Sequence, residues 1–432
     1  MPEAALAASA KRYWPKLATT LAEGYGPADL RHDAIAGLTV AIVALPLSMA
    51  IAIASGVSPE RGLYTAIVGG FLVSALGGSR FQVGGPAGAF IVLVAATVAK
   101  FGIDGLILTV FLSGLMLALL GLLRLGSLIR HIPHAVTVGF TAGIAVTILA
   151  SQMKDLFGLT LPGVEPGPVI PKLAALAHAW PSASLPAFAL ALAVIAITVG
   201  VRRARPLWPA MLIAVSAASI AAAVLHLPLE TIGTRFGGIP HGLPLPHLPT
   251  VTLQKVVAVL PAALSFTLLG GIESLLSAVV ADGMSGRRHR SNMELTAQGV
   301  ANMASALFGG ISVTGTIART ATNVRAGARS PVAGMLHSVF LLAFMIVAAP
   351  LASYVPVSAL AGVLVLVAWN MAEKPAIARL LRDWRGAAVL LTTFGLTVAR
   401  DLTTGIGCGC ALAAVLWGLQ LWRAKRGASR EA

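Results

Sequence analysis

The sequence predicts an all-α polytopic membrane protein with about 14 transmembrane segments, in two inverted halves of seven with one half-helix in each half. Three observations lead to this fold class. Hydrophobic residues make up 57% of the 432-residue chain and charged residues only 11%, whereas a soluble domain carries roughly 25% charged residues. Apolar stretches recur along the whole chain. Two of these stretches, in matching places, are too short to cross a bilayer.

The apolar stretches set the number of segments. They fall at residues 34–55, 62–77, 87–99, 105–123, 134–153, 186–201, 207–225, 256–280, 294–308, 316–325, 332–349, 357–372, 386–399 and 404–422. A helix needs about 20 apolar residues to cross a hydrocarbon core about 30 Å thick. Stretches 87–99 and 316–325 are shorter, and each follows a glycine-rich run, at 84–86 and 309–315. We expect these two to be half-helices that begin inside the membrane.

The half-helices are segments 3 and 10, so they occupy the same place in each run of seven. Because seven is odd, the second run crosses the membrane in the opposite sense, as in an inverted repeat whose broken helices meet at the midplane. The predicted organisation is a cytoplasmic N-terminal segment (1–32), a first repeat (33–226), an extracytoplasmic loop (227–254), a second repeat (255–424) and a cytoplasmic tail (425–432).

The distribution of positive charge predicts the orientation. The formal net charge is +15, which in a soluble protein would suggest nucleic acid. Here the basic residues form short clusters between apolar runs, mostly on the side that holds both termini. This is the bias of cytoplasmic loops. We therefore expect a multi-pass protein of the cell's inner (plasma) membrane with cytoplasmic termini, lipid as a partner, and no nucleic acid.

No catalytic or cofactor motif accompanies this pattern. The chain has no Walker motif, no HExxH and no nucleophile elbow, which argues against an enzyme and against an ATP-driven pump. Its two cysteines, Cys408 and Cys410, form a Cys-x-Cys pair without a nearby histidine, a poor metal site. No cofactor is expected beyond a coupling ion, H⁺ or Na⁺.

The two interruptions carry the candidate anion-binding residues. Each is expected to enter as extended backbone and then start a helix, so two helix N-termini face one another across a cavity. Unpaired N–H groups and about half a positive charge at each N-terminus make an anion site without any charged side chain. The residues placed there are Ala87, Gly88, Ala89, Gly315, Thr316 and Ile317. The alternative is that the glycines only allow tight helix packing.

Two ionisable residues are expected at membrane depth, where charges are costly and usually functional. Arg319 lies about one turn into the second half-helix and would add positive potential to the anion site. Glu273, the only carboxylate placed near the bilayer centre, would carry a proton or bind Na⁺, with Ser277 one turn later on the same side. The alternative for both charges is a buried Glu273–Arg319 salt bridge.

At these residues the chain resembles the sulfate permease (SulP) family, bacterial relatives of the animal multifunctional anion exchangers and prestin. The resemblance covers about residues 30–424. It rests on GLTVAIVALPLSMA at 37–50, GLYTA at 62–66, GGSRFQVGGP at 77–86, IESLLSAVVADG at 272–283 and VTGTIARTATNVRAG at 313–327.

The resemblance implies a seven-plus-seven inverted repeat with a core and a gate domain, usually dimeric, and an anion held between segments 3 and 10. It implies that Glu273 matches an Asp or Glu position that binds Na⁺ or couples protons, and that Arg319 matches an arginine near the anion site. Two departures stand out. The sequence ends at Ala432 without the cytoplasmic STAS domain usual in the family, and Leu47 follows Pro46 where many sulfate-type members have Gln, a pattern closer to carriers of bicarbonate or dicarboxylates.

These observations predict a secondary active transporter of small anions (sulfate, bicarbonate or dicarboxylate), coupled to H⁺ or Na⁺ and working by an elevator-like movement. Two alternatives stay open. One is an anion channel or exchanger without ion coupling. The other is a nucleobase permease of the same fold, which would need carboxylates in segments 8 and 10, whereas segment 10 carries Arg319.

Overall fold

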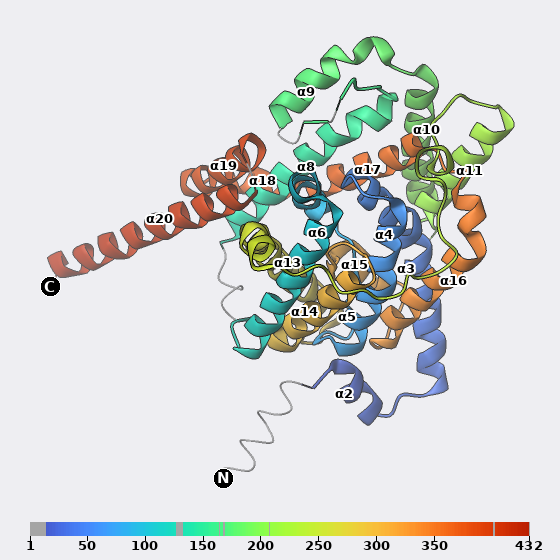
Figure 1. The fold of residues 1–432 in the computed structure, drawn as a ribbon. Coiled ribbons are helices and arrows are strands. Elements are labelled where there is room, and N and C mark those ends of the chain that lie inside the picture. Colours follow the sequence, from blue (N-terminus) through green and yellow to red (C-terminus); the bar gives the residue numbers. More distant parts are fainter. Residues whose placement is uncertain are drawn as a thin grey trace.

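The computed structural model of the chain describes residues 14–126, 133–163, 165–166, 169–206, 208–400 and 402–431. Within these residues the chain forms helices that pack side by side into one body, from which the C-terminal helix projects (Figure 1). Parts of the predicted terminal segments, at 1–13 and 432, lie outside the described residues.

The first half of the chain begins with a short helix and continues through helices of unequal length. Its elements are α2 (Lys16–Ala22), α3 (Pro27–Ala54), α4 (Pro59–Tyr64), the π-helical turn η2 (Thr65–Gly69), α5 (Gly70–Leu76), β1 (Gly84–Gly85), the 3₁₀ turn η3 (Gly88–Phe90), α6 (Ile91–Leu122), α8 (His134–Phe157), α9 (Val169–His178), η4 (Trp180–Ser182), α10 (Leu185–Ala204) and α11 (Ala210–Val224).

The second half repeats this order of long and interrupted helices. Its elements are α12 (Ile232–Phe236), α13 (Leu253–Ser285), α14 (Ser291–Leu307), β2 (Thr314–Gly315), α15 (Ile317–Arg325), α16 (Val332–Ala352), α17 (Val357–Met371), α18 (Lys374–Leu380), α19 (Trp384–Ala399) and α20 (Leu402–Glu431).

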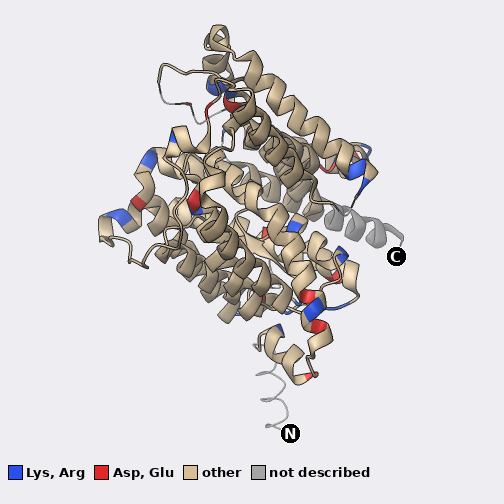
Figure 2. Ribbon diagram, turned by 90° about the vertical axis from the view of Figure 1, so that its right-hand side faces the viewer, with Lys and Arg blue, Asp and Glu red and all other residues tan. Residues whose placement is uncertain are grey.

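The chain is a polytopic membrane protein. Among the described residues, seven helices are long and apolar enough to span a bilayer, and four further apolar helices have 10–17 residues. The seven lie at Pro27–Ala54, Gly88–Leu122, His134–Phe157, Leu185–Ala204, Leu253–Ser285, Val332–Ala352 and Val357–Leu380. Charged residues gather beside the N-terminal helix and at the opposite end of the body, while most of the ribbon between them is uncharged (Figure 2).

The predicted segments 87–99 and 105–123 differ from the structure in one respect. They join end to end as α6, which bends sharply where Gly102 takes a φ of 67° and a ψ of −174°. A positive φ of this kind is accessible to glycine at little cost. The two predicted segments therefore point in different directions, although both belong to the single helix α6.

The two interruptions meet in the middle of the molecule, as predicted. β1 and β2 pair antiparallel, with Gly84 opposite Gly315 and Gly85 opposite Thr314. This two-residue ladder is the one sheet in the described part of the chain. Each strand leads directly into a helix, β1 through η3 into α6 and β2 into α15. Two helix starts are thereby held side by side by main-chain hydrogen bonds.

The remaining backbone of the second interruption is satisfied by side chains. The Ile311 amide donates to Thr65 Oγ1 at 2.7 Å. Asn302 accepts from the Val313 amide at 3.1 Å and donates to the Val313 carbonyl at 2.8 Å. Non-helical backbone at membrane depth is tolerated only where protein or a cavity satisfies it. Thr65 and Asn302 therefore make the extended strand possible.

The helices sort into two groups. The strand-bearing group consists of α3, α4, α5, α6, α13, α14, α15 and α16, which pack around β1 and β2. In it α3 packs on α16, and α6 packs on both α13 and α14. The flanking group consists of α8, α10, α11, α17, α19 and α20, with α8 packed between α17 and α19. Contacts of α3 with α11 and α17 join the two groups.

Candidate functional site

The candidate site is built where the two strands end and their helices begin, near α15 in the centre of Figure 1. The Thr316 amide donates to the Val83 carbonyl at 3.1 Å, and the Val83 amide donates to Thr320 Oγ1 at 3.2 Å. These bonds fix the start of α15 against the first interruption. Because the first N–H groups of a helix have no intrahelical partner, donors and partial positive charge gather here.

The three predicted residues of the first interruption lie between the two helix groups. Ala87 and Ala89 are buried. A Cβ added at Gly88 would lie 3.3 Å from Met371 Sδ on α17 and 3.6 Å from Ile148 Cδ1 on α8. Gly88 is therefore the point at which the first half-helix faces the flanking group, with no side chain of its own in the gap.

The predicted residues of the second interruption differ in exposure. Gly315 is buried so closely that a Cβ there would lie 1.5 Å from Gln82 Nε2. Thr316 is 9% exposed, and its hydroxyl donates to the Val83 carbonyl at 3.4 Å. Ile317 is 36% exposed. The strand end is therefore closed by protein at Gly315 and Thr316, while Ile317 is exposed.

Arg319 is the largest fully buried side chain of this region, at 2% exposure. Its Nη2 donates to Ser48 Oγ at 3.0 Å and its Nη1 to the Gly84 carbonyl at 3.4 Å, while its Nε has no partner. A Cβ at Gly85 would lie 1.8 Å from Nη1, so the glycine makes room for the guanidinium. Arg319 forms no ion pair with any described carboxylate.

The alternative of a Glu273–Arg319 salt bridge is therefore wrong for this conformation. Glu273 lies on α13, is 8% exposed, and makes no hydrogen bond or ion pair within the described part of the chain. Ser277 donates to Thr320 Oγ1 at 3.0 Å and so ties α13 to α15. Whether Glu273 and Ser277 serve ion coupling, or hold Na⁺, stays a prediction.

Sequence reasoning missed Gln82 as an individual residue, although it lies in the GGSRFQVGGP run. Its Nε2 donates to Ser274 Oγ at 2.8 Å and to the Ser274 carbonyl at 3.2 Å, and its Oε1 has no partner. Ser274 directly follows Glu273 on α13. Gln82 thus connects the first interruption to the helix that carries the buried acid. A polar residue beside Gly84-Gly85 was the available signal.

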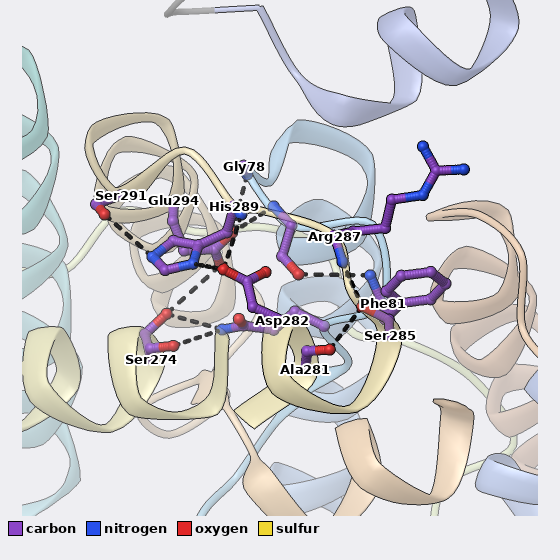
Figure 3. Close-up of polar contacts among 12 residues, drawn as sticks. Gly78, Phe81, Ser274, Ala281, Asp282, Ser285, Arg287, His289, Ser291 and Glu294 are labelled. Carbon is purple, nitrogen blue, oxygen red and sulfur yellow. Dashed lines mark hydrogen bonds and ion pairs between the residues drawn. The ribbon is translucent and has the colours of Figure 1, made fainter. Parts of the chain in front are cut away.

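Another buried acid is Glu294, which is the first residue of the predicted segment 294–308. The structure buries it completely at the start of α14. One carboxylate oxygen accepts from the amides of Gly78 and Ser79 at 2.8 and 3.1 Å, and the other accepts from Ser274 (Figure 3). The second oxygen also accepts from Gln298 Nε2 at 3.3 Å. Glu273 is therefore not the only buried carboxylate, because the α5–β1 loop folds over Glu294 and Asp33 on α3 is buried as well.

The loop between α13 and α14 is closed by a chain of side chains, also seen in Figure 3. His289 Nδ1 contacts Asp282 Oδ2 at 2.6 Å, and its Nε2 contacts Ser291 Oγ at 3.0 Å. Asp282 also accepts from the His289 amide at 3.0 Å. This chain fixes the direction in which α14 leaves α13, and with it the position of Glu294.

With this geometry in place, residues 30–393 match the sulfate permease family. The chain belongs to the sulfate permease family. It is 42% identical over 407 residues to the putative sulfate transporter YvdB of Bacillus subtilis, covering 91% of this chain and 75% of that protein. It is 31% identical over 402 residues to the bicarbonate transporter BicA of Picosynechococcus, covering 90% of this chain and 70% of BicA.

Solved structures show the same fold. The transmembrane domain of a cyanobacterial BicA superposes with a TM-score of 0.80 at 30% identity, covering 88% of this chain and 98% of that domain. The overall structure of SLC26A9 superposes with a TM-score of 0.87 at 20% identity, covering 97% of this chain and 70% of that one. The chain therefore has the seven-plus-seven fold of these domains. It is a membrane protein of an anion-transporter family and not an enzyme.

Proposed function

We propose that the chain is a secondary active transporter that binds a small anion between η3–α6 and α15. The observation that carries this proposal is Arg319, a fully buried cation beside two helix starts and with no acid partner among the described residues. Removing a charge from water is costly unless an opposite charge or strong hydrogen bonds offset the cost. A bound sulfate, bicarbonate or dicarboxylate would supply that opposite charge.

The residues near the strand ends suit such a ligand. Main-chain N–H groups at the starts of two helices donate to an anion and add to the field of the guanidinium. Gly88, Gly315 and Thr316 leave little bulk at the strand ends, and the unpaired Nε of Arg319 is a further donor. Oxyanions with two or more acceptor oxygens match this set of donors.

Coupling is assigned to Glu273. Its carboxylate lies within the protein without a partner among the described residues, so it can take up a proton, or bind Na⁺ as an oxygen ligand. Ser274, the next residue, is bonded to Gln82. Charge changes at Glu273 would thereby be felt at the first interruption through one pair of hydrogen-bonded side chains.

Transport would proceed by movement of the strand-bearing group past the flanking group. The interruptions, Arg319 and Glu273 all belong to the first group, whereas Gly88 meets Ile148 and Met371 of the second. Helices of the first half pack on helices of the second, α3 on α16 and α6 on α13, and this packing supports an inverted repeat. We further propose a homodimer in the inner membrane with both termini in the cytoplasm, which the bias of basic residues supports.

Uptake into proteoliposomes tests this proposal. Labelled sulfate, bicarbonate and fumarate would each be offered with and without inward Na⁺ and H⁺ gradients. Saturable uptake of one anion, driven by one gradient, is expected. Flux that neither saturates nor shows counterflow would instead indicate a channel, and uptake of a labelled nucleobase would indicate the permease alternative.

The coupling role has its own variant. Glu273→Gln keeps the size of the side chain and removes its charge. It is expected to abolish gradient-driven accumulation while anion exchange down a concentration gradient continues. Unchanged accumulation in this variant would contradict the role of Glu273.

A further inference from the structure

A cavity lies in the flanking group, away from the half-helices. It has a volume of about 260 Å³ and lies between the end of α8 and the starts of α10 and α17. Its lining includes Lys154, Asp155, Ser184, Glu230, Val357 and Ser358. Ser358 and Met371, the residue that faces Gly88, are 13 residues apart on α17. At 1.5 Å per residue this is about 20 Å, so the cavity is distinct from the site at the strand ends.

Two long helices begin at this cavity. α10 has 20 residues and starts after Ser184, whose hydroxyl accepts from the Ala187 amide at 3.4 Å. α17 has 15 residues and starts after Pro356, and the Val357 amide donates to the Glu230 carbonyl. The positive ends of both helix dipoles therefore converge on one space.

An unpaired polar group points to a ligand in that space. Ser358, at the second position of α17, is 4% exposed and lines the cavity. Its Oγ has no hydrogen-bond partner. A buried hydroxyl without a partner is costly, and such groups in native proteins usually meet a ligand or a water molecule.

The charged groups around the cavity balance, so no net negative charge excludes an anion. Arg235 Nη1 lies 2.9 Å from Asp155 Oδ1 and 3.5 Å from Glu230 Oε2, and the positive charges of Arg235 and Lys154 together balance the negative charges of the two carboxylates. Lys154 forms no ion pair within the described residues. Two of the carbonyls at the end of α8 have partners, because that of Lys154 accepts from the Leu159 amide and that of Phe157 from the Ser184 amide, both at 2.8 Å.

We propose that this cavity binds a small oxyanion, such as sulfate or bicarbonate, as an accessory site separate from the one beside Arg319. Ser358 Oγ and Lys154 Nζ are its side-chain donors, and the starts of α10 and α17 supply the main-chain field. α17 runs from this cavity to Met371, which faces Gly88. An ion bound in the cavity therefore stabilises the helix past which the first half-helix moves in the proposed transport cycle.

Equilibrium binding of labelled selenate to the purified full chain tests the proposal. The wild-type protein is expected to bind two selenate ions per chain. Arg319→Gln is expected to keep one of them, and Lys154→Gln combined with Ser358→Ala is expected to lose that one while keeping the ion beside Arg319. The ion that remains shows that this double variant is folded.

Two further variants sharpen the result. Lys154→Gln alone is expected to weaken accessory binding about tenfold, which corresponds to about 1.4 kcal/mol. Ser219→Ala, a hydroxyl on α11 bonded to its own helix, is the control and is expected to change neither site. The proposal is overturned if Arg319→Gln binds no selenate, or if the Lys154 and Ser358 changes leave its remaining binding intact. If the wild-type protein binds a single selenate ion, which Arg319→Gln keeps and the Lys154 and Ser358 changes remove, the proposed transport site is refuted and the accessory site stands.

Discussion

The two interruptions share their geometry but not their chemistry. Both are short strands that pair with each other and lead into a helix. The first, residues 82–90, has no charged side chain, and its Gly88 faces the flanking group. The second, residues 309–320, carries Arg319, which is buried against Gly84 and Ser48. The two interruptions therefore contribute different features to the site. The first allows a close approach to the backbone, and the second supplies a fixed positive charge.

The largest expected effect comes from removing that charge. Arg319→Gln would cost about 1.5–3 kcal/mol of anion binding, the range for a hydrogen bond to a charged group, and so lower anion affinity by at least tenfold. The measurement is the concentration dependence of anion uptake into proteoliposomes. Arg325→Gln, which removes an exposed arginine from the same helix, is the matched control and should leave that affinity unchanged.

A substitution in the first interruption should also lower anion affinity, without any change of charge. In Gly85→Ala the new Cβ would lie 1.8 Å from Arg319 Nη1, so the guanidinium must move while the backbone stays. We expect a severalfold loss of anion affinity in a protein with nearly normal thermal stability. Wild-type anion affinity in Gly85→Ala would show that the position of the guanidinium is unimportant. It would contradict the roles assigned to the two interruptions.

A milder effect is expected at Gly88, where the nearest atom to an added Cβ is Met371 Sδ at 3.3 Å. A flexible thioether can give way by a few tenths of an ångström. Gly88→Ala should therefore slow turnover more than it weakens binding, since it fills the gap between the two helix groups. The double variant Gly88→Ala/Met371→Ala should recover turnover, and the two changes would then be coupled in a double-mutant cycle.

The smallest effect is expected outside the membrane-spanning part, at Glu23. Its carboxylate pairs with Arg80, two residues before the first interruption, and this hydrogen bond lowers the pKa of Glu23 below its usual value. A lowered pKa contributes stability above the usual value and loses it as the pH falls. Because Glu23 is exposed, solvent screens the pair. Glu23→Gln should change the melting temperature only slightly at pH 7, and the difference from wild type should vanish in acid.

Several features were predictable from contiguous residues. Hydropathy located the two half-helices, because a stretch too short to span a bilayer is visible in the sequence itself. The run VTGTIARTATNVRAG placed Arg319 beside the second helix start, and IESLLSAVVADG placed Glu273 in the middle of a long apolar helix. The family follows from the same runs. These properties depend on order along the chain, which the sequence contains in full.

Partners across the fold were not predictable in this way. The sequence left open a Glu273–Arg319 salt bridge, and the structure instead seats Arg319 against Ser48 and Gly84. Glu294 looked like the edge of a segment until the α5–β1 loop was seen to cover it. Such contacts depend on how two elements far apart in the chain are turned toward each other.

The sequence by itself determined that the chain crosses a membrane, that two of its helices are broken, and which ionisable residues lie near the breaks. Hydropathy and glycine content act locally, so order along the chain is enough to reveal them. Only the tertiary structure decided that β1 pairs with β2, that Gln82 meets Ser274, and that Ser358 lines a cavity while its hydroxyl has no hydrogen-bond partner. Each of these depends on packing between distant segments, where the geometry of the whole bundle sets which groups meet.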